Sequence, residues 1–298
     1  MRVTEGIISR SIANGLAKLG SDLQNLNLQI SSGKRLLAPS DDPAGAVAAL
    51  AVRGKLAGLE QAKRNVDSWR GWLQATENAM SSAQSVASRA RELAVQMSNA
   101  TYEPAQRINA AQEINNLLEE LVALGNTRHQ DRYVFAGFRD DAKAFEVTRV
   151  NGDITAVTYA GDSGHHEIKL GPDSRMESSL TGQEAFMASS DLFQALIDLR
   201  EALKNNDPDG AADVISDLEN AGNNLSAKVA DVGSRVNRCD MRLTIIQDTK
   251  LADTERLAEI EDVDLVAAII SLQTKEVVYE AALKTAATLQ QLNLAAYI

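Results

Sequence analysis

The sequence has few of the residues on which disulfide scaffolds, metal centres and aromatic-rich cores depend. Its 298 residues include one cysteine, five prolines and two tryptophans, and aromatic residues make up 4%. A single cysteine excludes an internal disulfide and a cysteine-based zinc site. So few prolines leave long stretches without a helix breaker. The composition therefore predicts a mainly α protein, in which long helices pack on one another.

Basic residues are also in the minority. Thirty Lys and Arg stand against 41 Asp and Glu, which gives a net charge of -11. Nucleic acid and anionic membrane surfaces need clustered basic residues, so we expect neither as a partner. Gln290, Gln291 and Asn293 interrupt the apolar C-terminal run, which argues against membrane insertion. Residues 1–20 carry scattered charges and no continuous apolar stretch, so we expect no cleavable signal peptide.

Both ends of the chain carry apolar residues at helical spacing, three or four positions apart. The N-terminal set, which ends at Gly33, is Ile8, Ile12, Leu16, Leu19, Leu23, Leu26 and Ile30. The C-terminal set is Leu265, Ile269, Leu272, Tyr279, Leu283, Leu289 and Leu292. Residues 281–298 hold a single charged side chain, Lys284. Because such helices would be unstable in water alone, we predict that these two sets pair as coiled coils and form an assembly interface.

Long helices are predicted inside the two ends. One runs from Ala44 to about Ala100, and a second ends near Gly125. The short segment Asn99–Pro104 joins them, which predicts an antiparallel hairpin. The second helix is expected to bury one face, made of Ile108, Ile114, Leu117, Leu121 and Leu124.

Helical spacing returns after residue 191. It predicts a short helix that ends before Pro208 and a long helix from about Gly210. Cys239 lies in the apolar stripe of that long helix, so we expect a small buried residue there and not a reactive thiol. Trp69 and Trp72, in the first long helix, are expected in the core and at its edge.

A β-rich insert interrupts the helices. Phe145–Val150 and Ile154–Tyr159 flank Asn151-Gly152, the strongest short-range signal for a β-hairpin. The chain is therefore expected to form three parts. They are a terminal coiled-coil domain of residues 1–40 and 262–298, a helical core of 41–138 and 188–261, and a β-rich outer domain of 139–187.

Residues suited to chemistry are scarce. His165 and His166 fall on a third expected strand, where neighbouring side chains point to opposite faces and cannot share one metal ion. An exposed, solvated strand is the favoured interpretation. The sequence has no nucleophile elbow and no glycine-rich dinucleotide fingerprint. We therefore predict no catalytic, cofactor-binding or metal-binding residues, and no enzyme.

Several motifs resemble those of one family. Gln29–Leu36, followed by Pro39-Ser40-Asp41-Asp42-Pro43, is similar to the N-terminal signature of the flagellins and their hook–filament junction relatives. The second proline of that motif resembles the junction proteins more than flagellin itself. Arg91–Gln96, Tyr133–Phe138 and Gly182–Phe186 are also similar to the junction proteins, and residues 264–292 resemble the C-terminal helix of the family.

The resemblance implies a structural component of the bacterial flagellum. Such a protein leaves the cell through the flagellum's own export channel and assembles through its terminal helices at the hook–filament junction. The implied partners are hook-associated protein 1, flagellin, further copies of the same chain in a ring, and an export chaperone on the C-terminal helix.

Three alternatives remain open from the sequence. A small flagellin would grow long filaments from seeds, whereas a junction protein would not. An enzyme or metal-binding protein would use the β insert around His165. A coiled-coil scaffold would stay in the cytoplasm.

Overall fold

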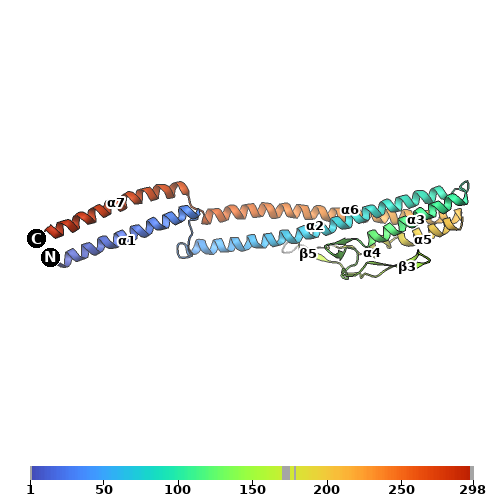
Figure 1. The fold of residues 1–298 in the computed structure, drawn as a ribbon, viewed down its shortest axis with the longest axis horizontal. Helices are drawn as coiled ribbons and strands as arrows, with labels where there is room; N and C mark the ends of the chain where they lie inside the picture. The colour runs from blue at the N-terminus through green and yellow to red at the C-terminus, as the bar shows by residue number, and fades with distance from the viewer. Residues whose placement is uncertain (1, 170–174, 178, 296–298) are drawn as a thin grey trace. The chain divides into compact units, whose positions relative to one another are not determined.

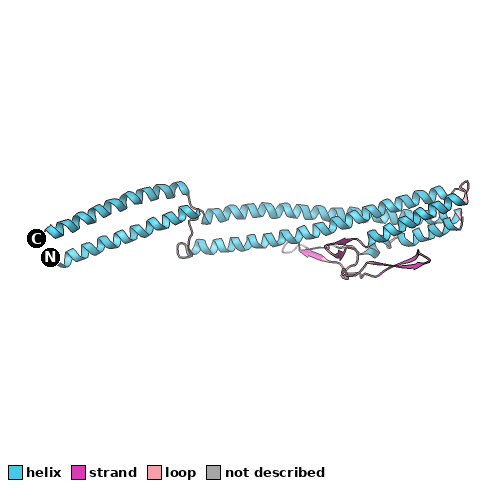
Figure 2. Cartoon of the chain, viewed as in Figure 1, coloured by secondary structure: helices cyan, strands magenta, loops and turns pink. Residues whose placement is uncertain are grey.

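The structure is a computed structural model that describes residues 2–169, 175–177 and 179–295. For Ile8, Leu289 and Leu292 it describes the backbone and not the side chain. The described chain is mainly α, as predicted (Figure 2). Its elements, in order, are α1 (Arg2–Ser32), α2 (Pro43–Met97), α3 (Pro104–Gly125), β1 (Arg128–His129), β2 (Arg132–Tyr133), β3 (Phe145–Val150), β4 (Asp153–Tyr159), β5 (Glu167–Lys169), β6 (Arg175–Glu177), α4 (Gly182–Phe186), α5 (Leu192–Lys204), α6 (Pro208–Glu261) and α7 (Leu265–Ala295).

The chain forms two compact units. The first contains residues 1–59 and 248–298, and the second contains residues 60–247. The finer division into three parts that the sequence suggests stays a prediction.

In the first unit, α1 and α7 lie side by side as an antiparallel pair (Figure 1). The Nζ of Lys275 lies 2.8 Å from Oδ2 of Asp22 and joins the two helices. The predicted pairing of the two terminal segments is therefore confirmed.

The second helix starts where Asp42 caps it. Oδ1 of Asp42 accepts a hydrogen bond from Gly45 N at 2.9 Å, and Pro43 occupies the first helical position. The neighbouring Asp41 has a different role, because it accepts hydrogen bonds from Leu37 N and Ala38 N in the preceding turn.

The second unit has a continuous buried core. The helix α3 packs against α5, and an ion pair between Arg89 and Glu113 joins α3 to α2 (Nε to Oε1, 2.7 Å). The pair spans the short connection between α2 and α3, as expected for the predicted antiparallel hairpin. Trp72 and Cys239 are buried and Trp69 is half-buried, as predicted.

The buried face of α3 differs from the prediction at Ile108, which is 57% exposed. Ala110, Ile114, Leu118 and Leu121 make that face instead. Ile108 lies about a third of a turn away from this line of residues, because successive residues of an α-helix are about 100° apart. Leu117 and Leu124 are half-buried at its edge.

The insert is built around the predicted hairpin of β3 and β4. Asn151 and Gly152 at its tip have φ values of +55° and +95°, the two positive values that a type I′ turn needs. Under the hairpin, the rings of Phe145, Phe186 and Phe193 pack with centroids 4.8–5.7 Å apart. The remaining strands form two further two-stranded sheets, β1 with β2 and β5 with β6.

Arg200 ties this insert to the helices. Its side chain is 1% exposed, and its guanidinium donates to Ile154 O at 2.7 Å and to Asn115 Oδ1 at 3.0 Å. One buried cation thus joins α5, β4 and α3.

We predict that Arg200→Ala destabilises the second unit by about 3–5 kcal/mol, because it leaves buried acceptors without a donor. Guanidinium denaturation followed by circular dichroism measures the change. The matched control is Arg91→Ala, since Arg91 makes only a surface contact with Glu219 at 3.4 Å and is expected to cost below about 1 kcal/mol. Equal losses in the two variants would contradict the role given to Arg200.

Candidate assembly interface

The predicted interface residues divide into two groups. Those that are half-buried between α1 and α7 are Ile12, Leu16, Leu19, Leu23, Leu26, Ile30, Leu272 and Tyr279. Leu265, Ile269 and Leu283 are exposed, at 47%, 44% and 44%. The side chains of Ile8, Leu289 and Leu292 lie outside the described part. The structure therefore brings one group together and leaves the other uncovered.

The seam between α1 and α7 consists of matched layers. On α7 its covered positions are Ala268, Leu272, Lys275, Tyr279, Ala282 and Ala286. Their spacing is four, three, four, three and four. The α1 positions from Ile30 back to Ile12 have the same spacing. The two helices are antiparallel, and counting in this spacing from the Asp22–Lys275 ion pair matches the large Leu16 of α1 with the small Ala282 of α7.

The prediction missed the alanines of α7. A search for large apolar residues finds Leu265 and Ile269, yet the face that meets α1 includes Ala268, which is 6% exposed. Alanine at heptad-like spacing was the available signal, because small residues permit close approach of two helices.

The opposite face of α7 is apolar and uncovered. Val266, Ile270 and Val277 are 70%, 59% and 68% exposed. On a helix with 3.6 residues per turn, they lie about half a turn from the seam. The exposed face of α1 is mixed, because Asn14, Gln24 and Asn25 lie there beside Ile7 and Leu28, which are 62% and 49% exposed. α7 also carries the exposed charged residues Glu276, Glu280 and Lys284, so its uncovered apolar residues are concentrated around Ile270.

This apolar character does not amount to a membrane span. Among the described residues, no helix combines the length and hydropathy that crossing a bilayer needs. An uncovered apolar helix face of this kind suits a protein partner.

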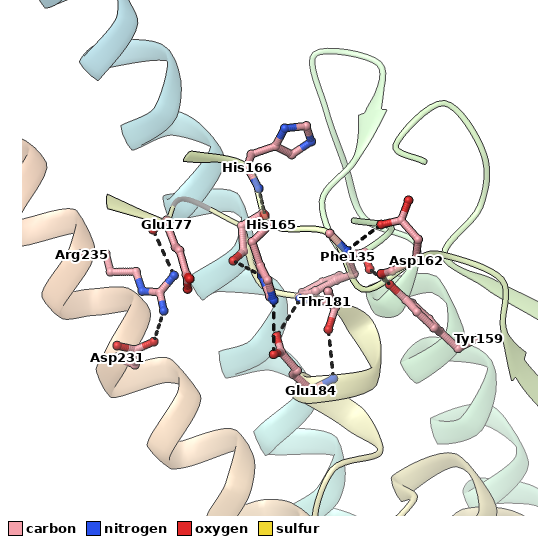
Figure 3. Close-up of polar contacts among 12 residues, drawn as sticks. Phe135, Tyr159, Asp162, His165, His166, Glu177, Thr181, Glu184, Asp231 and Arg235 are labelled. Atoms are coloured by element: carbon pink, nitrogen blue, oxygen red, sulfur yellow. Dashed lines mark hydrogen bonds and ion pairs between the residues drawn. The ribbon is translucent and has the colours of Figure 1, made fainter. Parts of the chain in front are cut away.

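The histidines of the insert occupy a second polar cluster (Figure 3). His165 and His166 precede β5 and are half-buried, so the expected exposed strand is wrong at this point. Ser179 holds the turn, because its Oγ accepts from His166 N at 2.7 Å. The two imidazoles point in opposite directions, as expected. His165 Nε2 lies 3.5 Å from Glu184 Oε1, and His166 Nε2 lies 3.2 Å from Asp140 Oδ2.

His166 packs among aromatic rings. Its centroid is 5.0 Å from Phe138, 5.6 Å from Trp69 and 6.3 Å from Trp72. Asp140 is buried, and Arg132 holds it by an ion pair at 2.5 Å. The imidazole therefore joins the insert to α2 by packing. The described residues contain no group of three or more His, Cys, Asp or Glu placed to hold a metal ion.

Other polar contacts in the same region fix the insert from both sides. Tyr159 donates its hydroxyl to Phe135 O and Asp162 O, at 3.0 and 2.8 Å, and burial raises the pKa of Tyr159 to about 12. Arg235 of α6 donates to Glu177 O at 3.0 Å and pairs with Asp231. These contacts hold the backbone in place, which is a structural role.

We predict that His166→Ala lowers the stability of the insert by about 1–3 kcal/mol, since it removes an aromatic contact and a partner of a buried carboxylate. The two tryptophans of the chain, Trp69 and Trp72, both lie at this cluster, so their fluorescence in urea reports the change. His165→Ala is the control, because its ring contacts neither tryptophan. An unchanged unfolding midpoint in His166→Ala would rule out the packing role.

The fold agrees with the comparisons to known proteins. The family model for the bacterial flagellin N-terminal helical region matches residues 4–140, and the model for the flagellin C-terminal helical region matches residues 215–298. Together they cover about three quarters of the chain. The chain therefore belongs to the flagellin family of flagellar structural proteins.

Particular members are similar over nearly the whole length. Flagellar hook-associated protein 3 of Escherichia coli K12 is 25% identical over 99% of this chain and 98% of its own. A flagellin of Listeria innocua is 25% identical over 92% of this chain and 90% of its own. The crystal structure of Bacillus cereus FlgL has the same fold, with a TM-score of 0.60 and 24% identity over 70% of this chain and 99% of that one.

Proposed function

We propose that this chain is an adaptor of the hook–filament junction, which joins hook-associated protein 1 to the flagellin filament as a ring of copies. The observation that supports this proposal is the uncovered apolar face of α7. A helix with one partner and two apolar faces needs a second partner. Relatives of this chain are structural parts of the flagellum, and this supports a structural role outside the cell and no enzymatic one.

Two features favour a junction adaptor over a small flagellin. The similarity to hook-associated protein 3 extends over 99% of the chain, compared with 92% for the Listeria flagellin at the same identity. The motif Pro39–Pro43 also has the second proline that is typical of junction proteins. A small flagellin remains the second candidate because the identities are equal.

The outer face of α7 is the proposed contact between copies. Val266, Ile270 and Val277 form its centre, and the exposed Leu265, Ile269 and Leu283 flank it. Full burial of one such side chain contributes about 1.5–3 kcal/mol. Before assembly the same face would need a cover, which supports an export chaperone bound to the C-terminal helix.

We predict that Ile270→Asp weakens ring assembly by about 100-fold or more, because an unpaired carboxylate on a buried face costs several kcal/mol. Sedimentation with purified hook-associated protein 1 of the same bacterium measures it. Asn25→Asp, which adds the same charge at an exposed polar position of α1, is the matched control and is expected to assemble normally. Assembly that survives Ile270→Asp would refute the proposed contact.

Deletion of residues 281–298 is expected to leave a folded, soluble monomer that cannot join a ring, since the second unit keeps its own core. Circular dichroism checks the fold and sedimentation checks assembly. Retained assembly would be the contrary result.

A seeded polymerisation assay separates the two candidate functions. The intact chain is added to short filament seeds and observed by electron microscopy. Rings or caps without elongation support the adaptor, whereas long filaments of this chain alone support a flagellin.

A further inference from the structure

The two breaks in the long helices of the first unit lie side by side. The chain leaves α1 at residues 33–42 and passes from α6 to α7 at residues 262–264. Lys34 and Asp262 form an antiparallel bridge, with Val263 N donating to Gly33 O at 3.1 Å and Arg35 N to Glu261 O at 2.6 Å. We call this joint, made of residues 33–35 and 260–263, the clasp.

A buried carboxylate lies at the centre of the clasp. Glu261 is 4% exposed, and its Oε2 lies 2.9 Å from the guanidinium of Arg53 and 3.5 Å from Nζ of Lys34. The two cations come from α2 and from the end of α1. Arg35 adds a bond to Ile260 O at 2.9 Å, and thus satisfies a carbonyl at the C-terminus of α6. These contacts join the C-terminal end of α6 to the C-terminal end of α1 and to α2.

Lys34 also has a second anionic partner. Its Nζ lies 2.5 Å from Asp262 Oδ1, and this hydrogen bond raises the pKa of Lys34 above its usual range.

The apolar seam alone specifies the alignment of α1 and α7 weakly. A shift of α7 by seven residues keeps the same spacing, and it places the small Ala282 level with Leu23 in place of Lys275. Repeating apolar seams tolerate such shifts, and buried polar contacts are the usual means of excluding them. Besides the clasp, the ion pair of Asp22 and Lys275 also distinguishes the two alignments.

We infer that Glu261 is a positioning residue that sets the axial alignment of α1 and α7 through the clasp. Removal of its charge leaves the seam intact and allows it to shift. This inference rests on the proposed function at one point only. The alignment sets the position along the helix axis at which α7 presents Val266, Ile270 and Val277 to another copy.

The role of Glu261 is tested by disulfide trapping in the full-length chain. The experiment uses a Cys239→Ser background and a low protein concentration. Leu16→Cys with Ala282→Cys reports the aligned seam. Leu23→Cys with the same Ala282→Cys reports the seven-residue shift. The ratio of the two cross-linking rates under a mild oxidant is the readout, since loss of folding would lower both rates and not their ratio.

We expect the aligned pair to form at least about 10-fold faster in the parent, and Glu261→Gln to lower the ratio by about 10-fold. Glu259→Gln, at an exposed position on the same helix, is the matched control and is expected to leave the ratio unchanged. Arg53→Gln provides a second variant and is expected to lower the ratio partly.

Two outcomes would overturn the role of Glu261: an unchanged ratio in Glu261→Gln and Arg53→Gln, or no preference for the aligned pair in the parent. Neither requires assembly, because trapping is measured on single chains. A failure of the junction role in the sedimentation assays would leave the cross-linking ratios unaffected.

Discussion

The two apolar faces of α7 are the constraint on which the first unit depends. An apolar helix face is stable only when covered. α1 covers one of these faces with its own apolar seam. The remaining side of α7, around Ile270, has no cover within the described part of the chain. This uncovered side is the face that the proposed assembly would bury.

The second unit contrasts with the first, because its apolar core is buried within the unit itself. Its phenylalanine cluster is buried, its buried Arg200 has acceptors on α3 and β4, and Asp140 has both Arg132 and His166. Arg200 and Asp140 have partners in the same chain, so these contacts explain stability and not binding. The need for a partner is therefore concentrated on the terminal helices.

The sequence predicted most of the helical architecture because strong periodicity and a few breakers define it. Asn151-Gly152 predicted the hairpin because only that turn type matches two residues with positive φ. Fine placement was less predictable. Ile108 was misplaced because Leu118 and not Leu117 sets the phase of the buried face of α3. His165 and His166 were misplaced because β5 begins only at Glu167, and the aromatic rings that receive His166 come from distant segments.

The clasp shows why the assembly interface could be predicted only in part. Large apolar residues indicate that two helices pair, but spacing in threes and fours is the same in several alignments. The information that selects one alignment lies in the polar contacts at the helix breaks, where Glu261 meets Arg53 and Lys34 across more than 200 positions of sequence. Burial of Glu261 costs desolvation energy, and the gain is specificity, because a seam of alanine and leucine alone would be stable in more than one arrangement. The apolar seam and the charged clasp therefore act together: the first supplies the association of α1 with α7, and the second selects the alignment in which α7 presents its free face.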